Sequence, residues 1–340
     1  MKQIFHTLAL AVLTSVLLAS CDITPKDAYI PVFGVTLDRD TLVIRIGDPD
    51  VKLTATVLHD NAPDTTVSWA SDDPDIATVD RDGVVKAVAA GRANVTVTTT
   101  EGNRTATCLV IIQGTIPEYV TIGGKQWAKM NLGATTVAGS YATCTGDYYQ
   151  WGSVNKLYKS VTWNGTSATF SWRPGKEKGF VADNLEYTAE DGLTAANDVA
   201  QQYVGDGWRT PTMDDFTALT ADCIKDYTPA PLFINIEANP SGESATVIKG
   251  VYWCTSYDGV AGVLFCNGRE RLFFPAAGTG AGTSPEAGEK AAYWTNEPYF
   301  NGSGCCLSLF FGTSYSLKVI QIPNVSSRFN YGTIRPVKDI

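Results

Sequence analysis

Histidine is almost absent from this sequence. The 340 residues include two histidines, His6 near the N-terminus and His59 in the first third of the chain. The stretch from Cys108 to Ile340 therefore has no imidazole to act as a general base or a metal ligand, which excludes Ser-His-Asp and Cys-His systems there. Carboxylate, tyrosine, lysine and cysteine chemistry remain. We expect a binding protein rather than an enzyme.

Three further features are lacking. None of the eight cysteines forms a CxxC pair, which removes the usual zinc and thioredoxin-like sites. Beyond the first twenty residues no apolar run is long enough to span a bilayer. The net charge of −9 and the pI near 4.8 leave no excess of positive charge for nucleic acid, so no nucleic-acid partner is expected.

The N-terminus is typical of a secretory signal peptide followed by a lipidation site. Lys2 precedes a short apolar stretch, and Leu18-Ala19-Ser20-Cys21 follows it. This tetrapeptide resembles the bacterial lipobox, whose cysteine is acylated and becomes the new N-terminus. The pattern predicts a lipoprotein signal peptide over 1–20, a tether over 21–33 and a lipid anchor at Cys21, in a surface-exposed outer-membrane lipoprotein. An ordinary signal peptide with an incidental cysteine is the alternative.

Residues 34–113 have the pattern of a β-sandwich. Short segments such as 42–46, 53–57 and 94–98 alternate apolar and polar side chains with the period of two that a half-buried strand requires. Asp82-Gly83 is a typical hairpin turn. Many short strands without a helix signal predict an immunoglobulin-like fold.

The same segment resembles the group 2 bacterial Ig-like domain (Big2). The family's conserved pattern is met by Trp69-Ala70-Ser71, by Ile76 to Asp80, by Gly83 to Ala87 and by Ala90-Gly91. The resemblance implies a spacer or stalk, and in some proteins an adhesin module. Trp69 is expected to fill the core between the two sheets.

Residues 117–340 have a different composition, with seven of the eight tryptophans. Two helices are expected, one beginning near Thr194 and one capped by Thr212, whose Thr-Met-Asp-Asp start resembles a capping box. Strands are expected over 250–255, 262–266 and 307–311, separated by long Gly-, Ser- and Asn-rich loops. This pattern predicts an α+β domain.

This part resembles the Fibrobacter succinogenes major paralogous domain, which is common in secreted and lipid-anchored proteins of Bacteroidetes. That family is related to the C-type lectin-like and formylglycine-generating-enzyme-like fold, so the resemblance implies that fold. The aromatic residues of its motifs are expected in the core. The matching segments are 120–128, 131–134, 146–152, 207–212, 272–278, 293–295 and 332–337.

The candidate ligand-binding residues lie mainly on a segment expected to be loop. Aromatic rings beside amide and carboxylate groups suit sugar binding, because the ring covers C–H groups while polar groups bind hydroxyls. The alternative is that these aromatics pin long loops to the body of the domain. The candidates here are Tyr158, Trp163, Trp172, Arg173, Asp183, Asn184 and Glu186.

Asn296 and Glu297 are the other candidates, because calcium-dependent lectins of the related fold carry a Glu-Pro-Asn triplet. Here the order is Asn-Glu-Pro, and two adjacent side chains do not supply the ~6–8 oxygen ligands that calcium needs. No cofactor is expected, with calcium retained as a minor hypothesis.

Cysteine supplies one enzymatic alternative and one structural prediction. Adjacent Cys305 and Cys306 suggest the cysteine chemistry of formylglycine-generating relatives, although neighbours on a strand point to opposite faces. Cys254 and Cys266 flank a predicted Asp258-Gly259 turn, so a disulfide across this hairpin is proposed.

The sequence as a whole predicts a lipid-anchored surface binding protein or adhesin, in which an Ig-like stalk presents a lectin-like head to a glycan or a protein. The alternative is an accessory or tip subunit of a fimbrial or polysaccharide-uptake assembly. A formylglycine-generating-like oxidoreductase ranks third.

Overall fold

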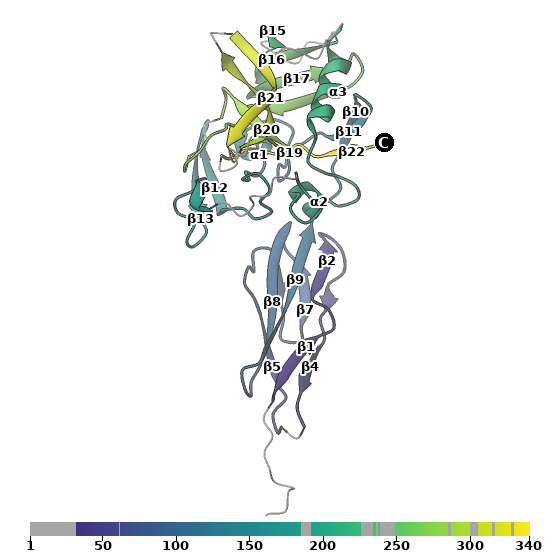
Figure 1. Cartoon of the computed structure of the whole chain (residues 1–340), viewed down its shortest axis with the longest axis vertical. Coiled ribbons are helices and arrows are strands. Elements are labelled where there is room, and N and C mark those ends of the chain that lie inside the picture. The colour runs from purple at the N-terminus through teal and green to yellow at the C-terminus, as the bar shows by residue number, and fades with distance from the viewer. Residues whose placement is uncertain are drawn as a thin grey trace, which may run out of the picture.

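The computed structural model describes residues 32–60, 62–184, 192–225, 234–235, 237–238, 249–284, 287–299, 305–314, 317–327 and 330–340. The predicted signal peptide, Cys21 and almost all of the tether therefore lie outside the described residues. An elongated β-sandwich is joined end to end with a broader C-terminal head (Figure 1). Within the described part, no helix is long and apolar enough to cross a membrane.

The first domain is a sandwich of a four-stranded and a three-stranded sheet, with a separate strand pair. β2 (Thr41–Arg45) and β9 (Thr105–Gln113) are parallel, whereas the other pairs are antiparallel. The larger sheet has the order β2 (Thr41–Arg45), β9 (Thr105–Gln113), β8 (Gly91–Thr99) and β5 (Val67–Ser71). The smaller one has the order β3 (Val51–Lys52), β7 (Val84–Ala87) and β6 (Ala77–Val79). The separate pair is β1 (Gly34–Leu37) with β4 (Ala55–Leu58).

The alternation of side chains predicted from the sequence builds the core of this sandwich. Along β8 the residues from Gly91 to Thr99 alternate between buried and more exposed positions. Trp69 packs, partly buried, against the core cluster between the sheets. Gly83 has a φ of +80°, and a Cβ there would lie 2.8 Å from the Trp69 ring, so the predicted Asp82-Gly83 turn requires glycine for two reasons.

The head combines several small sheets with two helices of five residues or more among its described residues. Its sheets have the orders β15-β16-β17-β18, β14-β21-β20-β19 and β10-β11-β22, and β12 pairs with β13. The strands are β10 (Tyr119–Ile122), β11 (Lys125–Ala128), β12 (Tyr158–Asn164), β13 (Ser167–Trp172), β14 (Ile234–Asn235), β15 (Glu237–Ala238), β16 (Gly250–Tyr257), β17 (Val260–Cys266), β18 (Arg271–Pro275), β19 (Ala291–Pro298), β20 (Cys305–Ser314), β21 (Leu317–Ser327) and β22 (Val337–Asp339).

The helices of the head are α1 (Tyr141–Cys144), α2 (Val199–Tyr203) and α3 (Met213–Cys223), with a 3-10 turn at Ala182–Asn184. Thr212 caps α3 through a full capping box with Asp215, as predicted. The predicted start of α2 near Thr194 is wrong. Thr194 belongs to a preceding turn, in which its N–H donates to Asn197 Oδ1, and Asp198 is the N-cap.

The core of the head is aromatic, as the motif residues predicted. Trp208, Trp253, Tyr293 and Trp294 are all buried. The guanidinium of Arg335, also buried, donates to the carbonyl oxygens of Ala128, Lys129 and Phe273. It also lies 4.6 Å from the centre of the Phe274 ring. Backbone acceptors and a ring face thus compensate this buried charge.

Two further sequence predictions are wrong. The segment expected to be loop after Tyr158 contains the β12–β13 hairpin, in which Tyr158 pairs with Trp172. The proposed disulfide is absent, because in the β16–β17 ladder Cys254 lies opposite Gly262, and Cys266 lies opposite Gly250. The two cysteines are displaced along the strands instead of facing each other.

Candidate functional site

The junction between the domains is organised around Arg45 at the end of β2. Its Nη1 donates to the carbonyl oxygens of Gly114 at 2.6 Å and Val204 at 3.0 Å. Its Nη2 donates to Gln113 Oε1 and forms an ion pair of 2.9 Å with Asp206 of the head. One guanidinium therefore joins the sandwich, the linker and the segment after α2.

Further contacts extend the junction on both sides of Arg45. Gly114 N–H donates to the Tyr203 carbonyl at 2.7 Å, and Arg92 Nη2 donates to Gln202 Oε1 at 2.6 Å. Ala90 packs against a cluster of the head that includes Tyr203. Polar and apolar contacts together fix the head on the end of the sandwich.

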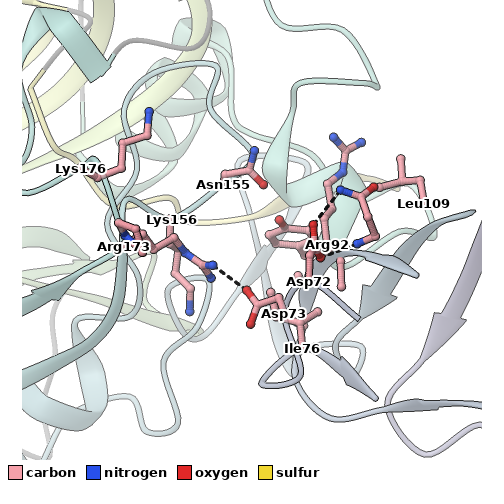
Figure 2. Close-up of a pocket in the computed structure, with 15 residues that line it drawn as sticks. Asp72, Asp73, Ile76, Arg92, Leu109, Asn155, Lys156, Arg173 and Lys176 are labelled. Atoms are coloured by element: carbon pink, nitrogen blue, oxygen red, sulfur yellow. Dashed lines mark hydrogen bonds and ion pairs between the residues drawn. The ribbon is translucent and has the colours of Figure 1, made fainter. Parts of the chain in front are cut away.

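A cavity of about 390 Å³ lies beside this junction, and we call it the interdomain cleft. In Figure 2, Arg173 and Lys176 of the head are on one side, and Asp72 and Asp73 of the sandwich are on the other. Ligand sites are often found at domain interfaces and typically have volumes of about 300–1,000 Å³. The lining residues are Asp72, Asp73, Ile76, Ala90, Gly91, Arg92, Ala93, Asn94, Leu109, Asn155, Lys156, Arg173, Pro174, Lys176 and Tyr203.

The cleft carries positive charge in an acidic protein. Four cationic side chains and two carboxylates line it, a formal excess of two positive charges, whereas the chain has a net charge of −9. Arg173 Nη1 crosses the cleft to Asp73 Oδ2 at 2.6 Å (Figure 2). Asp72 accepts from the backbone N–H and the Nδ2 of Asn94, at 2.7 and 2.9 Å.

The predicted sugar-binding aromatics pack against the body of the head. Tyr158 is buried, and its hydroxyl donates to Asp147 Oδ1. Trp163 stacks on Tyr141 with ring centres 6.1 Å apart, and Trp172 lies 4.8 Å from the Phe170 ring. These contacts agree with the alternative interpretation, in which the aromatic side chains hold this segment against the body of the domain. They also leave less of each ring face free to contact a sugar.

The polar candidates from the same segment are separated. Arg173 lines the interdomain cleft, whereas Asp183 forms an exposed ion pair with Lys178 at 2.6 Å. Asn184 ends the 3-10 turn, and its side chain lies outside what the structure describes. Glu186 is also outside the described residues.

Asn296 and Glu297 lie on β19, beside the start of α3. Asn296 N–H donates to the Pro211 carbonyl, and Glu297 Oε2 accepts from Met213 N–H at 2.8 Å. Burial raises the pKa of Glu297, and the nearby Asp214 and Asp215 also raise it. Among the described residues there is no group of three or more His, Cys, Asp or Glu arranged to hold a metal ion. Calcium binding stays a prediction.

Cys305 and Cys306, the basis of the enzymatic alternative, are consecutive residues of β20. They lie opposite Ser327 and Ser326 of β21.

The sandwich side of the interdomain cleft was not predicted from the sequence. Asp72, Asp73 and Arg92 were not proposed, because the Ser-Asp-Asp-Pro segment has the composition of a simple turn. The available signal was charge: two adjacent aspartates after β5, and an arginine at the start of β8. Without the relative position of the domains, neither could be assigned to a cleft with Arg173.

Comparison with known proteins identifies the first domain. Residues 31–110 match the family model of the bacterial Ig-like domain (group 2), and this part of the chain is a domain of that family. An uncharacterised protein of Clostridium acetobutylicum is 38% identical over 87 residues, covering 25% of this chain and 22% of the relative. An Ig-like virion protein of Serratia phage KSP90 is 36% identical over 96 residues, covering 28% of this chain and 37% of the relative.

Larger proteins share similar segments. A lacto-N-biosidase of Bifidobacterium bifidum is 37% identical over 90 residues, covering 26% of this chain and 8% of the enzyme. The matched part thus spans well under half the length of each of these relatives. Among solved structures, domains 5–6 of the S-layer protein SbsC cover 90% of this chain and 98% of their own, with 10% identity. Their TM-score of 0.22 is too low to compare the folds.

Proposed function

We propose that this protein is exported, lipid-anchored through Cys21 and exposed at the cell surface, where its Ig-like domain acts as a stalk for a binding head. The observation that carries this proposal is the position of the head, which is fixed at the end of the sandwich away from Val32. Val32 N–H donates to Glu101 Oε1 beside the β8–β9 turn, whereas Gly114 bonds to the head. The chain thus enters the sandwich at one end and leaves it at the other.

The dimensions suit a spacer. The nine residues of β9 run along the length of the sandwich (Figure 1), and a strand of that length spans roughly 27 Å. The Arg45 contacts stiffen the connection, so the head is held away from the point of attachment. By its name, one of the relatives is an Ig-like virion protein, which agrees with an extracellular role for such a domain.

We propose that the head has the C-type lectin-like fold and that its ligand is a glycan or a partner protein. The motif Trp208-Arg209-Thr210-Pro211-Thr212 supports this fold, since it leads from an isolated β-bridge into α3. Arg209 pairs with Val337 in an isolated bridge, and Thr212 opens α3.

Surface exposure is tested by protease treatment of intact cells that express the full chain. The wild type is expected to lose its head fragment to the protease, whereas a Cys21→Ser variant is expected to be released from the membrane fraction. A wild-type protein that is protected until the cells are lysed would contradict the surface location.

Binding is tested by screening the purified chain from residue 22 onward on a glycan array, with and without calcium. Reproducible binding to a defined set of glycans supports the proposed function. A blank array, together with crosslinking on cells that captures no partner, would contradict it.

A further inference from the structure

The interdomain cleft has the two kinds of polar group that an acidic sugar requires. Its head side supplies the cations Lys156, Arg173 and Lys176, and its sandwich side supplies Asp72, Asp73 and the cation Arg92 (Figure 2). Cations bind a carboxylate, and aspartate oxygens accept hydrogen bonds from hydroxyl groups. A simple anion such as phosphate would meet repulsion from the aspartates. A ligand with both a negative group and hydroxyl donors matches both sides.

Hydrogen-bonding capacity remains on both sides of the cleft. Arg173 uses Nη1 for Asp73, but its Nε is buried and has no hydrogen-bond partner among the described residues. Nε of Arg92 is likewise buried and has no hydrogen-bond partner among the described residues, whereas Nη2 of Arg92 donates to Gln202. A buried donor without an acceptor is costly, but solvent does not reach either Nε, so a ligand oxygen would pair with these atoms only after the arginine side chains shift. A carboxylate oxygen accepts more than one hydrogen bond, so Asp72 and Asp73 retain capacity as well.

Lys176 and Arg92 are the lining cations that have no carboxylate partner among the described residues, and Lys176 is the one on the head side. Lys156 is already within 3.2 Å of Asp147 Oδ1, and Arg173 is paired with Asp73. Within the described part of the chain, no carboxylate pairs with the ammonium group of Lys176. It is half-buried, on the turn that follows β13.

We propose that the interdomain cleft binds an acidic sugar residue, with the sugar carboxylate toward Arg173 and Lys176 and the hydroxyl groups toward Asp72 and Asp73. This inference rests on the proposed binding function, which it deepens by naming the ligand class and placing the site at the junction. Because residues of both domains contribute, the Ig-like domain is part of the site as well as the stalk.

The experiment compares matched acidic and neutral sugars by calorimetry on the chain from residue 22 onward. Trigalacturonic acid is paired with its methyl ester, and sialyllactose with lactose. We expect binding of at least one acidic member, about tenfold weaker binding of its neutral partner, and about tenfold weaker binding by Lys176→Gln. The affinity should also fall as salt is raised.

Lys52→Gln is the matched control, because Lys52 is an exposed lysine of β3 that does not line the cleft. It should bind as the wild type does. Arg173→Gln is a second variant with the same expected loss, and circular dichroism verifies that each variant is folded.

Several outcomes would overturn the inference. They are the absence of binding by either acidic sugar, equal binding of a neutral partner, and an affinity unchanged in both Lys176→Gln and Arg173→Gln. Equal binding of acetate or of a glutamate-rich peptide would also overturn it, because these carry the carboxylate without the sugar. If neutral glycans bind and the Lys176 variant binds them equally well, the acidic-sugar site is excluded but the proposed surface-binding function is not. If the protein is inaccessible on intact cells, the proposed surface-binding function itself is excluded.

Discussion

Asp215 shows how one buried carboxylate can organise its surroundings. Its Oδ2 accepts from Arg209 Nη1 at 2.5 Å and from Thr212 N–H at 2.7 Å, and Lys125 Nζ lies 3.7 Å from its Oδ1. Burial raises the pKa of this carboxyl, but hydrogen bonds from Arg209 and Thr212 outweigh burial and hold the pKa below its ordinary value of 3.8.

Asp215→Asn is expected to lower the free energy of unfolding by about 3 kcal/mol at pH 7, because it removes one partner of a buried ion pair. The folded-state pKa is depressed, so the stabilisation is fully present above 3.8 and is lost as pH falls through the lower folded-state value. The difference in the free energy of unfolding between the variant and the wild type should therefore shrink below pH 3.8. Urea unfolding over a pH series measures this difference.

Asp183→Asn is the control, since Asp183 forms an exposed ion pair. It should leave stability unchanged within error. If the difference in the free energy of unfolding between Asp215→Asn and the wild type stays constant across the pH series, the lowered pKa of Asp215 is contradicted.

Burial also determines how the cysteines react. It raises the pKa of Cys144 and of Cys223 to about 12, and that of Cys254 to about 11. At pH 8 the thiolate fraction of Cys254 is then roughly one part in a thousand, and access is blocked as well.

Iodoacetamide at pH 8 is expected to leave Cys254 unmodified in the folded protein and to label it rapidly in guanidinium. Mass mapping of the peptides gives the extent of labelling, and non-reduced digests should contain no peptide linking Cys254 to Cys266. Equal labelling of Cys254 with and without denaturant would show that it is accessible.

Among the secondary-structure elements, α2 depends on a single side chain. Asp198 is buried, and its carboxylate accepts from the N–H groups of Ala200 and Gln201, and from the N–H and hydroxyl of Thr210. It therefore both caps α2 and joins that helix to the segment leading into α3.

Asp198→Ala is expected to destabilise the protein by about 3 kcal/mol, because several buried donors lose their acceptor at once. Thr194→Ala, at the position that sequence pattern alone favours as the cap, should cost well under half as much. Thermal and urea unfolding measure both. A larger effect at Thr194 would contradict the structure.

These elements show what the sequence could predict. Thr212 and its capping box were predictable because both partners lie within three residues. The strands of the Ig-like domain were predictable because alternation and turn residues are local signals. Asp198 was missed although its capping bonds to Ala200 and Gln201 are local; no local pattern shows its bonds to Thr210, twelve residues away. The β12–β13 hairpin was missed although Asn164-Gly165, between two alternating segments, is a local hairpin signal.

The candidate site was predictable only in part. Arg173 was proposed as a ligand residue, but its partner Asp73 lies one hundred residues earlier in another domain. No local pattern connects the two. Tyr158 and Trp172 were proposed for their chemistry, whereas burial decides what a ring can contact.

The arrangement of the whole molecule depends on the junction. Arg45 bonds to both domains and to the linker between them, and its side chain is largely shielded from solvent. Small-angle scattering from Arg45→Ala is expected to show a wider range of particle lengths than the wild type, because hydrogen bonds to charged groups contribute about 1.5–3 kcal/mol each.

Arg39→Ala is the matched control, because Arg39 is exposed and bonds to Asp38 of its own domain. It should scatter as the wild type does. Identical profiles for Arg45→Ala and wild type would show that the apolar contacts alone hold the two domains.

The parallel pairing of β2 with β9 has a mechanical consequence. A pull between Val32 and Gly114 draws these strands in opposite directions along their length. The backbone hydrogen bonds that join Thr41–Arg45 to residues 109–113 are then loaded together in shear rather than opened one after another like a zipper. Forced unfolding follows the unfolding rate, and shear loading raises the force at which that rate becomes appreciable. A domain pulled in this direction therefore resists a steady force applied between its two ends.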